Sequence, residues 1–222
     1  MNLNSTQQTS APRPKTAVTR LQEKTRMTGI ILAGGENRRM GTDKAFLTVA
    51  GIPMIEHILG SLRSAATRII IVTNSPDSYA RYDVSLVKDF CNKRGPLTGI
   101  YSGLRYSNDE YNIVVACDMP FLNPKLLTYM AGLAGEHDVI VPKIGELVEP
   151  LHAVYYRKLL PVIEDHMKRE QQRIWGIFKG QRVRYLTEEE IDRFDPGRWS
   201  FVNLNTLEEY RKALCPDLEC RN

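Results

Sequence analysis

Short apolar segments alternate with amphipathic segments along the first half of the chain. Runs rich in β-branched residues predict buried strands, and they span 30–32, 68–72, 84–88 and 111–116. Apolar residues at helical spacing, or strong helix-start signals, predict helices between them, at 54–65, from Ser75, from 95 to about 106, and at 124–133 with Asn123 as the N-cap. This alternation predicts an α/β fold, a doubly wound and mostly parallel sheet of the Rossmann-like kind.

The second half of the chain has a less regular pattern. Strands are predicted at 138–142, 151–156, 182–186 and 201–205, and extended backbone also at 45–49. Helices are predicted at 159–168 and from Thr206 onwards. No internal repeat or linker divides the chain, so we expect one domain at 27–214 followed by a C-terminal tail at 215–222.

Residues 1–26 differ in composition from the rest. They are rich in Thr, Ser, Gln and Pro, carry several cations, and contain no apolar stretch of the kind that a secretory signal requires. We interpret this segment as a disordered tail, or as an extension translated from a misassigned start codon.

Overall composition changes this picture little. The chain has 222 residues, a net charge of +4 and a pI of about 8.8, which suits phosphorylated substrates but does not by itself indicate nucleic acid. No apolar run reaches the length of a membrane span. None of the four cysteines forms a Cys-x-x-Cys pair, so we expect a reducing, cytoplasmic setting and no zinc site.

A glycine-rich segment with cations follows the first predicted strand. Small residues allow backbone N–H groups to approach an anion closely, and cations neutralise its charge; the residues concerned are Leu32, Ala33, Gly34, Gly35, Arg38, Arg39 and Lys44. The spacing matches neither the Walker motif nor the dinucleotide fingerprint. The segment therefore predicts a polyphosphate site of another kind.

Polar residues also stand at the ends of the next three strands, namely Asn74, Asp89 and Asp118. In parallel sheets, ligands bind at the carboxyl ends of the strands. Asp118 follows an apolar strand and needs a cation or donors nearby, and a carboxylate beside phosphates suits Mg²⁺. The carboxylate of Asp89 has the geometry to accept both N1–H and N2–H₂ of guanine. Each of these residues also has a purely structural interpretation as a surface or turn residue.

Together these segments resemble a known family. Residues 32–44 are similar to the signature loop of nucleotidyltransferases, and most of all to the molybdenum cofactor guanylyltransferases, the MobA family; Cys117-Asp118-Met119-Pro120 resembles the magnesium motif of that family. The resemblance covers about 28–214. It implies transfer of GMP from GTP to the terminal phosphate of molybdenum-bearing molybdopterin (Mo-molybdopterin), with release of pyrophosphate.

The resemblance also implies roles for particular residues. The catalytic residues would be Arg39, Lys44 and Asp118, with Asp118 as the Mg²⁺ ligand. Nucleotide binding would involve Leu32, Ala33, Gly34, Gly35, Lys44, Asn74, Asp89, Gly95, Pro96, Gly99 and Asp118. The acceptor side would include Glu149, Pro150, Leu151, Asn203 and Asn205. Glu149 departs from the family pattern, which often has Gln at this place.

Other interpretations remain open at this stage. The chain could transfer a nucleotide to a sugar 1-phosphate or to phospholactate, or a cytidylyl group to molybdopterin. It could also be a nucleotide-binding regulatory domain without turnover, although the presence of both Lys44 and Asp118 argues against that. We interpret His152 as a structural residue rather than a ligand. We expect a monomer with no nucleic-acid partner and with transient contacts to other cofactor-biosynthesis proteins.

Overall fold

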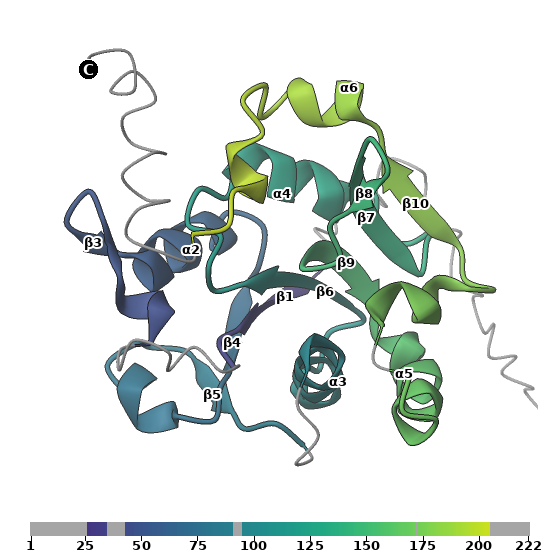
Figure 1. The fold of residues 1–222 in the computed structure, drawn as a ribbon, viewed down its shortest axis with the longest axis horizontal. Coiled ribbons are helices and arrows are strands. Elements are labelled where there is room, and N and C mark those ends of the chain that lie inside the picture. Colours follow the sequence, from purple (N-terminus) through teal and green to yellow (C-terminus); the bar gives the residue numbers. More distant parts are fainter. Residues whose placement is uncertain (1–25, 35–42, 91–94, 172, 205–222) are drawn as a thin grey trace, which may run out of the picture.

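A computed structural model describes residues 26–34, 43–90, 95–171 and 173–204 of the chain. Within them, eight strands form one sheet in the order β10-β7-β9-β6-β1-β4-β5, with β8 paired to β7 (Figure 1). The strands are β1 Met27–Leu32, β4 Arg68–Val72, β5 Ser85–Val87, β6 Tyr111–Ala116, β7 Val139–Ile144, β8 Leu147–Val148, β9 His152–Tyr156 and β10 Val183–Leu186. A separate hairpin pairs β2 Thr48–Val49 with β3 Ile52–Pro53.

The sheet is mixed but mostly parallel, as predicted. β5, β4, β1 and β6 are all parallel neighbours, and β10 is parallel to β7. β9 is antiparallel to both β6 and β7. The reason is the short connection through β8, which follows a turn at Gly145 (φ 58°): a parallel return would need a crossover of a dozen or more residues.

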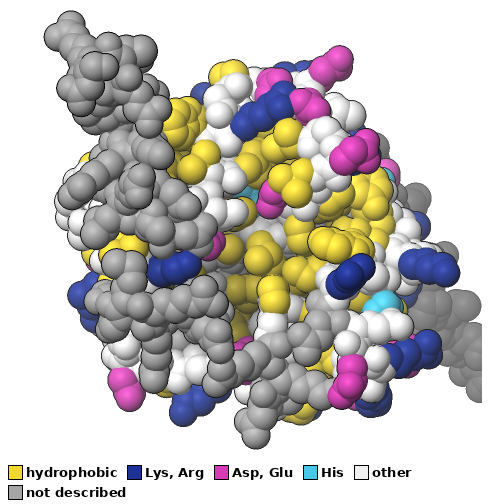
Figure 2. Space-filling model, viewed as in Figure 1, with side chains coloured by type: hydrophobic (Ala, Val, Ile, Leu, Met, Phe, Trp, Pro, Cys, Tyr) yellow, Lys and Arg dark blue, Asp and Glu magenta, His cyan; other side chains and the backbone are white. Residues whose placement is uncertain are grey.

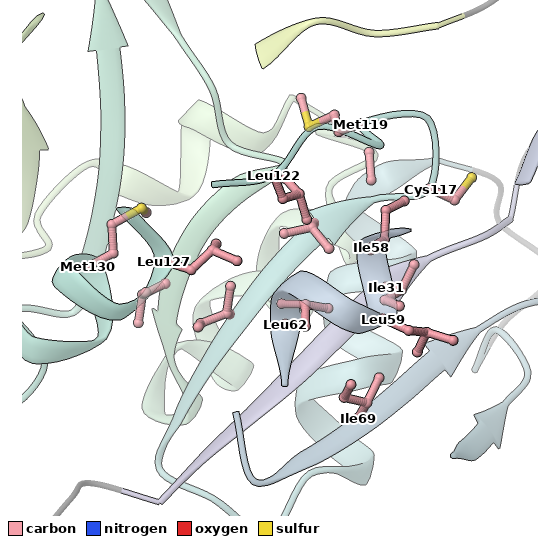
Figure 3. Packing of buried hydrophobic residues seen from close by; sticks show 14 of the residues in the cluster. Ile31, Ile58, Leu59, Leu62, Ile69, Cys117, Met119, Leu122, Leu127 and Met130 are labelled. Carbon is pink, nitrogen blue, oxygen red and sulfur yellow. The ribbon is translucent and has the colours of Figure 1, made fainter. Parts of the chain in front are cut away.

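Helices cover both faces of the sheet (Figure 1). α2 Met54–Leu62 and α4 Pro124–Gly132 pack on one face with one set of alternating strand residues, and Figure 3 shows Ile58, Leu59 and Leu62 of α2 against Ile31 and Ile69. α3 Pro96–Tyr106 and α5 Leu160–Lys168 pack on the other face. Every residue of β1 and β6 is buried because both faces are covered.

Capping side chains explain where two helices begin. The side chain of Asn123 accepts hydrogen bonds from the backbone N–H groups of Lys125 and Leu126, as predicted for the start of α4. α6 Glu188–Asp192 begins at a capping box between Thr187 and Glu190. The sequence analysis did not predict α6, although a Thr followed three residues later by Glu is the sequence signature of such a box.

Three local predictions are wrong. The segment predicted as extended at 45–49 begins as a 3₁₀ helix, Lys44–Phe46, because the side chain of Asp43 caps it. The helix predicted from Ser75 is a short 3₁₀ helix, Pro76–Tyr79, and the Ser75 side chain does not cap it.

The third wrong prediction is the strand at 201–205. A 3₁₀ helix, Trp199–Phe201, is followed by irregular backbone through Leu204, and the helix predicted from Thr206 lies outside the described residues. Leu204 is buried with Val49 and Met54, and its N–H donates to the carbonyl of Asp118 at 2.9 Å. Tertiary contacts therefore hold this segment in place of a β-ladder. No helix in the described parts of the chain is long and apolar enough to cross a membrane.

A close approach between α3 and β1 generates a stability prediction. A Cβ atom added at Gly103 of α3 would lie 2.5 Å from Cγ2 of Ile30 in β1. We expect Gly103→Ala to lower the free energy of unfolding by about 1–3 kcal/mol, because the buried neighbour must move. Gly60→Ala on the exposed side of α2, where nothing lies within 4 Å, should raise it by about 0.5–1 kcal/mol. Urea unfolding measures both, and equal stability of the two variants would contradict this packing.

Candidate functional site

Four parallel strands end at the same edge of the sheet. Leu32 at the end of β1 pairs with Val72 at the end of β4 and with Ala116 at the end of β6, and Val72 pairs with Val87 of β5. β4 and β5 lie on one side of β1 and β6 on the other, so the strand order reverses beside β1. Ligands of open α/β sheets bind in the crevice outside such a reversal. The residues predicted for the nucleotide therefore follow strands that end together.

On the β4–β5 side, three predicted residues come together. The amide Nδ2 of Asn74 donates a hydrogen bond of 2.9 Å to Oδ2 of Asp89. A Cβ atom on Gly34 would lie 3.6 Å from that oxygen and 4.0 Å from the amide nitrogen of Asn74. The exposed Gly34 backbone therefore borders a polar pair that can offer both acceptors and donors to a planar ring.

The second glycine segment lies beside the same strands. Gly95 precedes α3 with φ 143°, and Pro96 occupies the first turn. Gly99 is buried, and a Cβ atom there would lie 3.2 Å from Cδ2 of Leu32. Gly99 thus has a packing function, because it lets the first turn of α3 approach the end of β1.

On the β6 side, three charged residues surround a buried thiol. Burial raises the pKa of Cys117, the charges of Asp118 and Asp43 raise it further, and the charge of Lys44 lowers it. Ala45, which follows Lys44, is buried in the same hydrophobic cluster as Cys117, which precedes Asp118. The structure thereby packs together the segments that carry Lys44 and Asp118, which are separated by more than seventy positions in the sequence.

The backbone around Asp118 is held from two directions. The N–H of Cys117 donates to the carbonyl of Leu32 at 3.2 Å, and the carbonyl of Asp118 accepts from the N–H of Leu204 at 2.9 Å. Among the described residues, no three His, Cys, Asp or Glu side chains gather around a common metal position. A single carboxylate fits Mg²⁺, which takes one or two protein carboxylates and completes its coordination with substrate phosphates and water.

The residues predicted for the acceptor lie beside the end of β6. The carbonyl of Leu151 accepts from the N–H of Ala116 at 3.0 Å, and the carbonyl of Pro150 accepts from the Tyr155 hydroxyl at 2.8 Å. Glu149 is half-buried, and this burial raises the pKa of its carboxyl group. Asn203 is exposed on the irregular segment before Leu204. Hydrophobic side chains gather over β8 and β9 on this face (Figure 2).

Some of the predicted site residues cannot be placed. Gly35, Arg38, Arg39 and Asn205 lie outside the described residues. Conversely, the sequence analysis missed Asp43 and Tyr79, whose side chains hydrogen-bond to each other at 2.6 Å beside Lys44. Asp43 precedes a predicted phosphate-binding Lys, which is a weak signal, whereas nothing in the sequence around Tyr79 indicates this contact.

Comparison with known proteins identifies the family. The model of the MobA-like NTP transferase domain matches residues 29–186. The chain belongs to this family. It is therefore a nucleotidyltransferase, and the family and enzyme class inferred from the sequence are confirmed.

Named relatives cover most of this MobA-like transferase. A molybdenum cofactor guanylyltransferase of Desulfosudis oleivorans is 40% identical over 189 residues, which are 84% of this chain and 94% of that protein. A probable molybdenum cofactor guanylyltransferase of Peptoclostridium acidaminophilum is 36% identical over 82% of this chain and 86% of that protein. The crystal structure of molybdopterin-guanine dinucleotide biosynthesis protein A from Archaeoglobus fulgidus superimposes with a TM-score of 0.73 at 26% identity, covering 85% of this chain and 98% of that one.

His152 has a buried, structural environment. It is fully buried at the start of β9, its ring lies 5.0 Å from that of Phe201, and neither ring nitrogen has a partner with full hydrogen-bond geometry. Burial lowers the pKa of His152 to about 4, although the backbone of Ser200 and the charge of Asp195 act in the opposite direction. These contacts support the structural interpretation of this residue.

The buried His152 generates a prediction about acid stability. Because the folded-state pKa of about 4 lies below the ordinary value of 6.5, the unfolded state binds the proton more readily. The free energy of unfolding should therefore be unaffected by this group above pH 6.5 and fall by up to about 3 kcal/mol as the pH decreases from 6.5 to 4.

Chemical denaturation of wild type and His152→Leu across this pH range isolates the effect, because the other titrating groups are common to both proteins. The difference in stability between them should change with pH only between about 4 and 6.5. Parallel stability curves would show that His152 does not titrate in this way.

Proposed function

We propose that this MobA-like transferase moves GMP from GTP to the terminal phosphate of Mo-molybdopterin and releases pyrophosphate. Relatives 34–40% identical over most of the chain carry the name molybdenum cofactor guanylyltransferase, in one case as probable. The observation that carries the proposal is that Asn74, Asp89 and Asp118 follow strands that end at one edge of the sheet, with Asn74 hydrogen-bonded to Asp89. The segment of Lys44 packs in the same cluster as Cys117, next to Asp118.

Asp89 is proposed to recognise the base. Its carboxylate would accept N1–H and N2–H₂ of guanine, a pair of adjacent donors that cytosine and uracil lack. The hydrogen bond of 2.9 Å from Asn74 to Asp89 supports this function because it orients the carboxylate. The absence of a side chain at Gly34 leaves space beside the pair.

Lys44 is proposed to bind the outer phosphates, together with Arg39 and the Gly34–Gly35 backbone. A cation at this place neutralises charge that develops on the departing pyrophosphate. Leu32, Ala33, Gly95 and Pro96 would contribute the walls and backbone of the nucleotide site. The mildly basic composition of the chain is consistent with two polyanionic substrates.

Asp118 is proposed as the protein ligand of Mg²⁺. Bound there, the metal would supply Lewis-acid polarisation of the α-phosphate. The proposal is supported by the backbone hydrogen bonds from Cys117 to Leu32 and from Leu204 to Asp118, which hold this turn next to the end of β1. Since the attacking group is already an anionic phosphate, the chemistry requires position and charge stabilisation rather than a general base.

The acceptor is proposed to bind on the β9 side of Asp118. The turn at Glu149–Leu151 is hydrogen-bonded to the end of β6, which places it next to the catalytic aspartate. Asn203 and Asn205 would provide amide donors to the acceptor phosphate. We further propose that the protein acts as a cytoplasmic monomer with transient contacts to other proteins of cofactor biosynthesis.

Pyrophosphate release tests the function directly. We expect release from GTP, and not from ATP, CTP or UTP, only when Mo-molybdopterin and Mg²⁺ are both present. Asp118→Asn should keep the fold and lower the rate roughly a hundredfold or more, because a metal ligand in the transition state is lost.

The possible results separate the alternatives. A preference for CTP would indicate cytidylyl transfer, and turnover with a sugar 1-phosphate or phospholactate would indicate another transferase of this fold. Absence of release with any acceptor would indicate a nucleotide-binding domain without turnover. A near wild-type rate for Asp118→Asn would remove Asp118 from the proposed metal site.

The base preference gives a separate prediction for Asp89. Asp89→Asn replaces one acceptor by a donor that opposes guanine, so the discrimination between GTP and ITP, which lacks the N2 amine, should shrink roughly tenfold to a hundredfold. Specificity constants for both nucleotides in both proteins measure this ratio. Asp83→Asn, at an exposed carboxylate on the approach to β5, serves as the matched control. An unchanged ratio in Asp89→Asn would assign base recognition to backbone groups of the glycine segments.

A further inference from the structure

A buried tyrosine contacts the segment that carries Lys44. The hydroxyl of Tyr79 donates a hydrogen bond of 2.6 Å to Oδ2 of Asp43. Tyr79 ends the 3₁₀ helix after β4 and its side chain is fully buried. A short hydrogen bond from a buried hydroxyl to a carboxylate is stronger than one between neutral groups. This contact therefore joins two segments that are distant in the sequence.

Asp43 uses its second oxygen to organise the backbone on either side of Lys44. Oδ1 accepts from the N–H of Ala45 at 3.1 Å and caps the 3₁₀ helix Lys44–Phe46. The carbonyl of Asp43 accepts from the N–H of Phe46 at 3.0 Å. Lys44 thus lies between Asp43, whose carboxylate is hydrogen-bonded to Tyr79, and Ala45, whose N–H donates to the same carboxylate.

Packing holds Tyr79 in the orientation that this bond needs. The ring of Tyr79 lies 4.9 Å from that of Phe46, at the far end of the same 3₁₀ helix. Burial and the bond to Asp43 both raise the pKa of Tyr79, which favours the neutral hydroxyl that donates this bond.

Tyr79 also connects the two ends of the proposed nucleotide site. It follows Asn74 by five residues, and the N–H of Thr73, just before Asn74, donates to the carbonyl of Val87 in β5 at 2.8 Å. Through Asn74, which is hydrogen-bonded to Asp89, and Tyr79, which is hydrogen-bonded to Asp43, this segment contacts both parts of the proposed nucleotide site.

We propose that Tyr79 is a positioning residue for the triphosphate, which acts through the Tyr79–Asp43 hydrogen bond to hold Lys44 at the outer phosphates. The proposal rests on the proposed function, in which Lys44 binds these phosphates. Tyr79 does not touch the nucleotide itself. Its loss should weaken recognition of groups that GTP has and GMP lacks, while recognition of the base stays unchanged.

The test compares the binding of GTP and GMP by calorimetry in the presence of Mg²⁺. Tyr79→Phe keeps the ring that packs on Phe46 and removes only the hydroxyl. We expect a loss of GTP affinity of about tenfold, with GMP affinity within twofold of wild type. In turnover, the KM for GTP should rise by a similar factor while kcat changes less.

Tyr82→Phe is the matched control. The Tyr82 hydroxyl also donates to a carboxylate, that of Glu56 at 3.1 Å, three residues further along the same segment, but it does not reach Asp43. The Tyr82→Phe variant should leave the affinities for GTP and for GMP unchanged. If Tyr79→Phe does not fold, Asp43→Asn replaces it, because the amide oxygen can keep the cap on Ala45 while the bond to Tyr79 becomes a weaker one between neutral groups.

The outcomes separate this proposal from the proposed function. Unchanged GTP affinity in Tyr79→Phe, or an equal loss for GTP and GMP, would overturn the positioning role, since the first shows no coupling to Lys44 and the second a general structural defect. Failure of the proposed function would instead be seen in the wild-type protein, as absence of pyrophosphate release. The binding comparison does not depend on turnover, so the two failures cannot be confused.

Discussion

Parallel pairing of β1 with β4 and β6 is the constraint on which the site depends. The three strands pair residue by residue, so that Leu32, Val72 and Ala116 end at one level. Both β1 and β6 are buried on their two faces, and a slip of one residue would exchange the residues that face the two helix layers. Core packing therefore determines the register, and the register determines where the polar residues after each strand are placed.

Beyond the strand ends, a few hydrogen bonds convert this edge into an ordered site. Asn74 holds Asp89, Tyr79 holds Asp43, and Leu204 holds the backbone of Asp118. Each bond joins segments from different parts of the chain. Together they favour one arrangement of the groups that would contact the nucleotide.

The main outline of the fold could be predicted because its signals are local. β-branched runs and helical spacing indicated the strands and the major helices, and polar residues directly after apolar strands indicated Asp89 and Asp118. Predictions failed where long-range contacts decide the local structure. The segment ending at Leu204 is irregular because it packs on Val49 and Met54, and the 3₁₀ helix at Lys44 depends on the cap from Asp43.

The sequence alone determined the α/β class and the family, because these follow from periodicity and from motifs of neighbouring residues. Only the tertiary structure decided which residues meet. It brought Tyr79 to Asp43 across 36 positions, turned Gly99 toward Leu32 as a packing residue, and buried His152 beside Phe201 away from any ligand role. Such contacts depend on how strands pair and helices pack, and no pattern within a single segment encodes them.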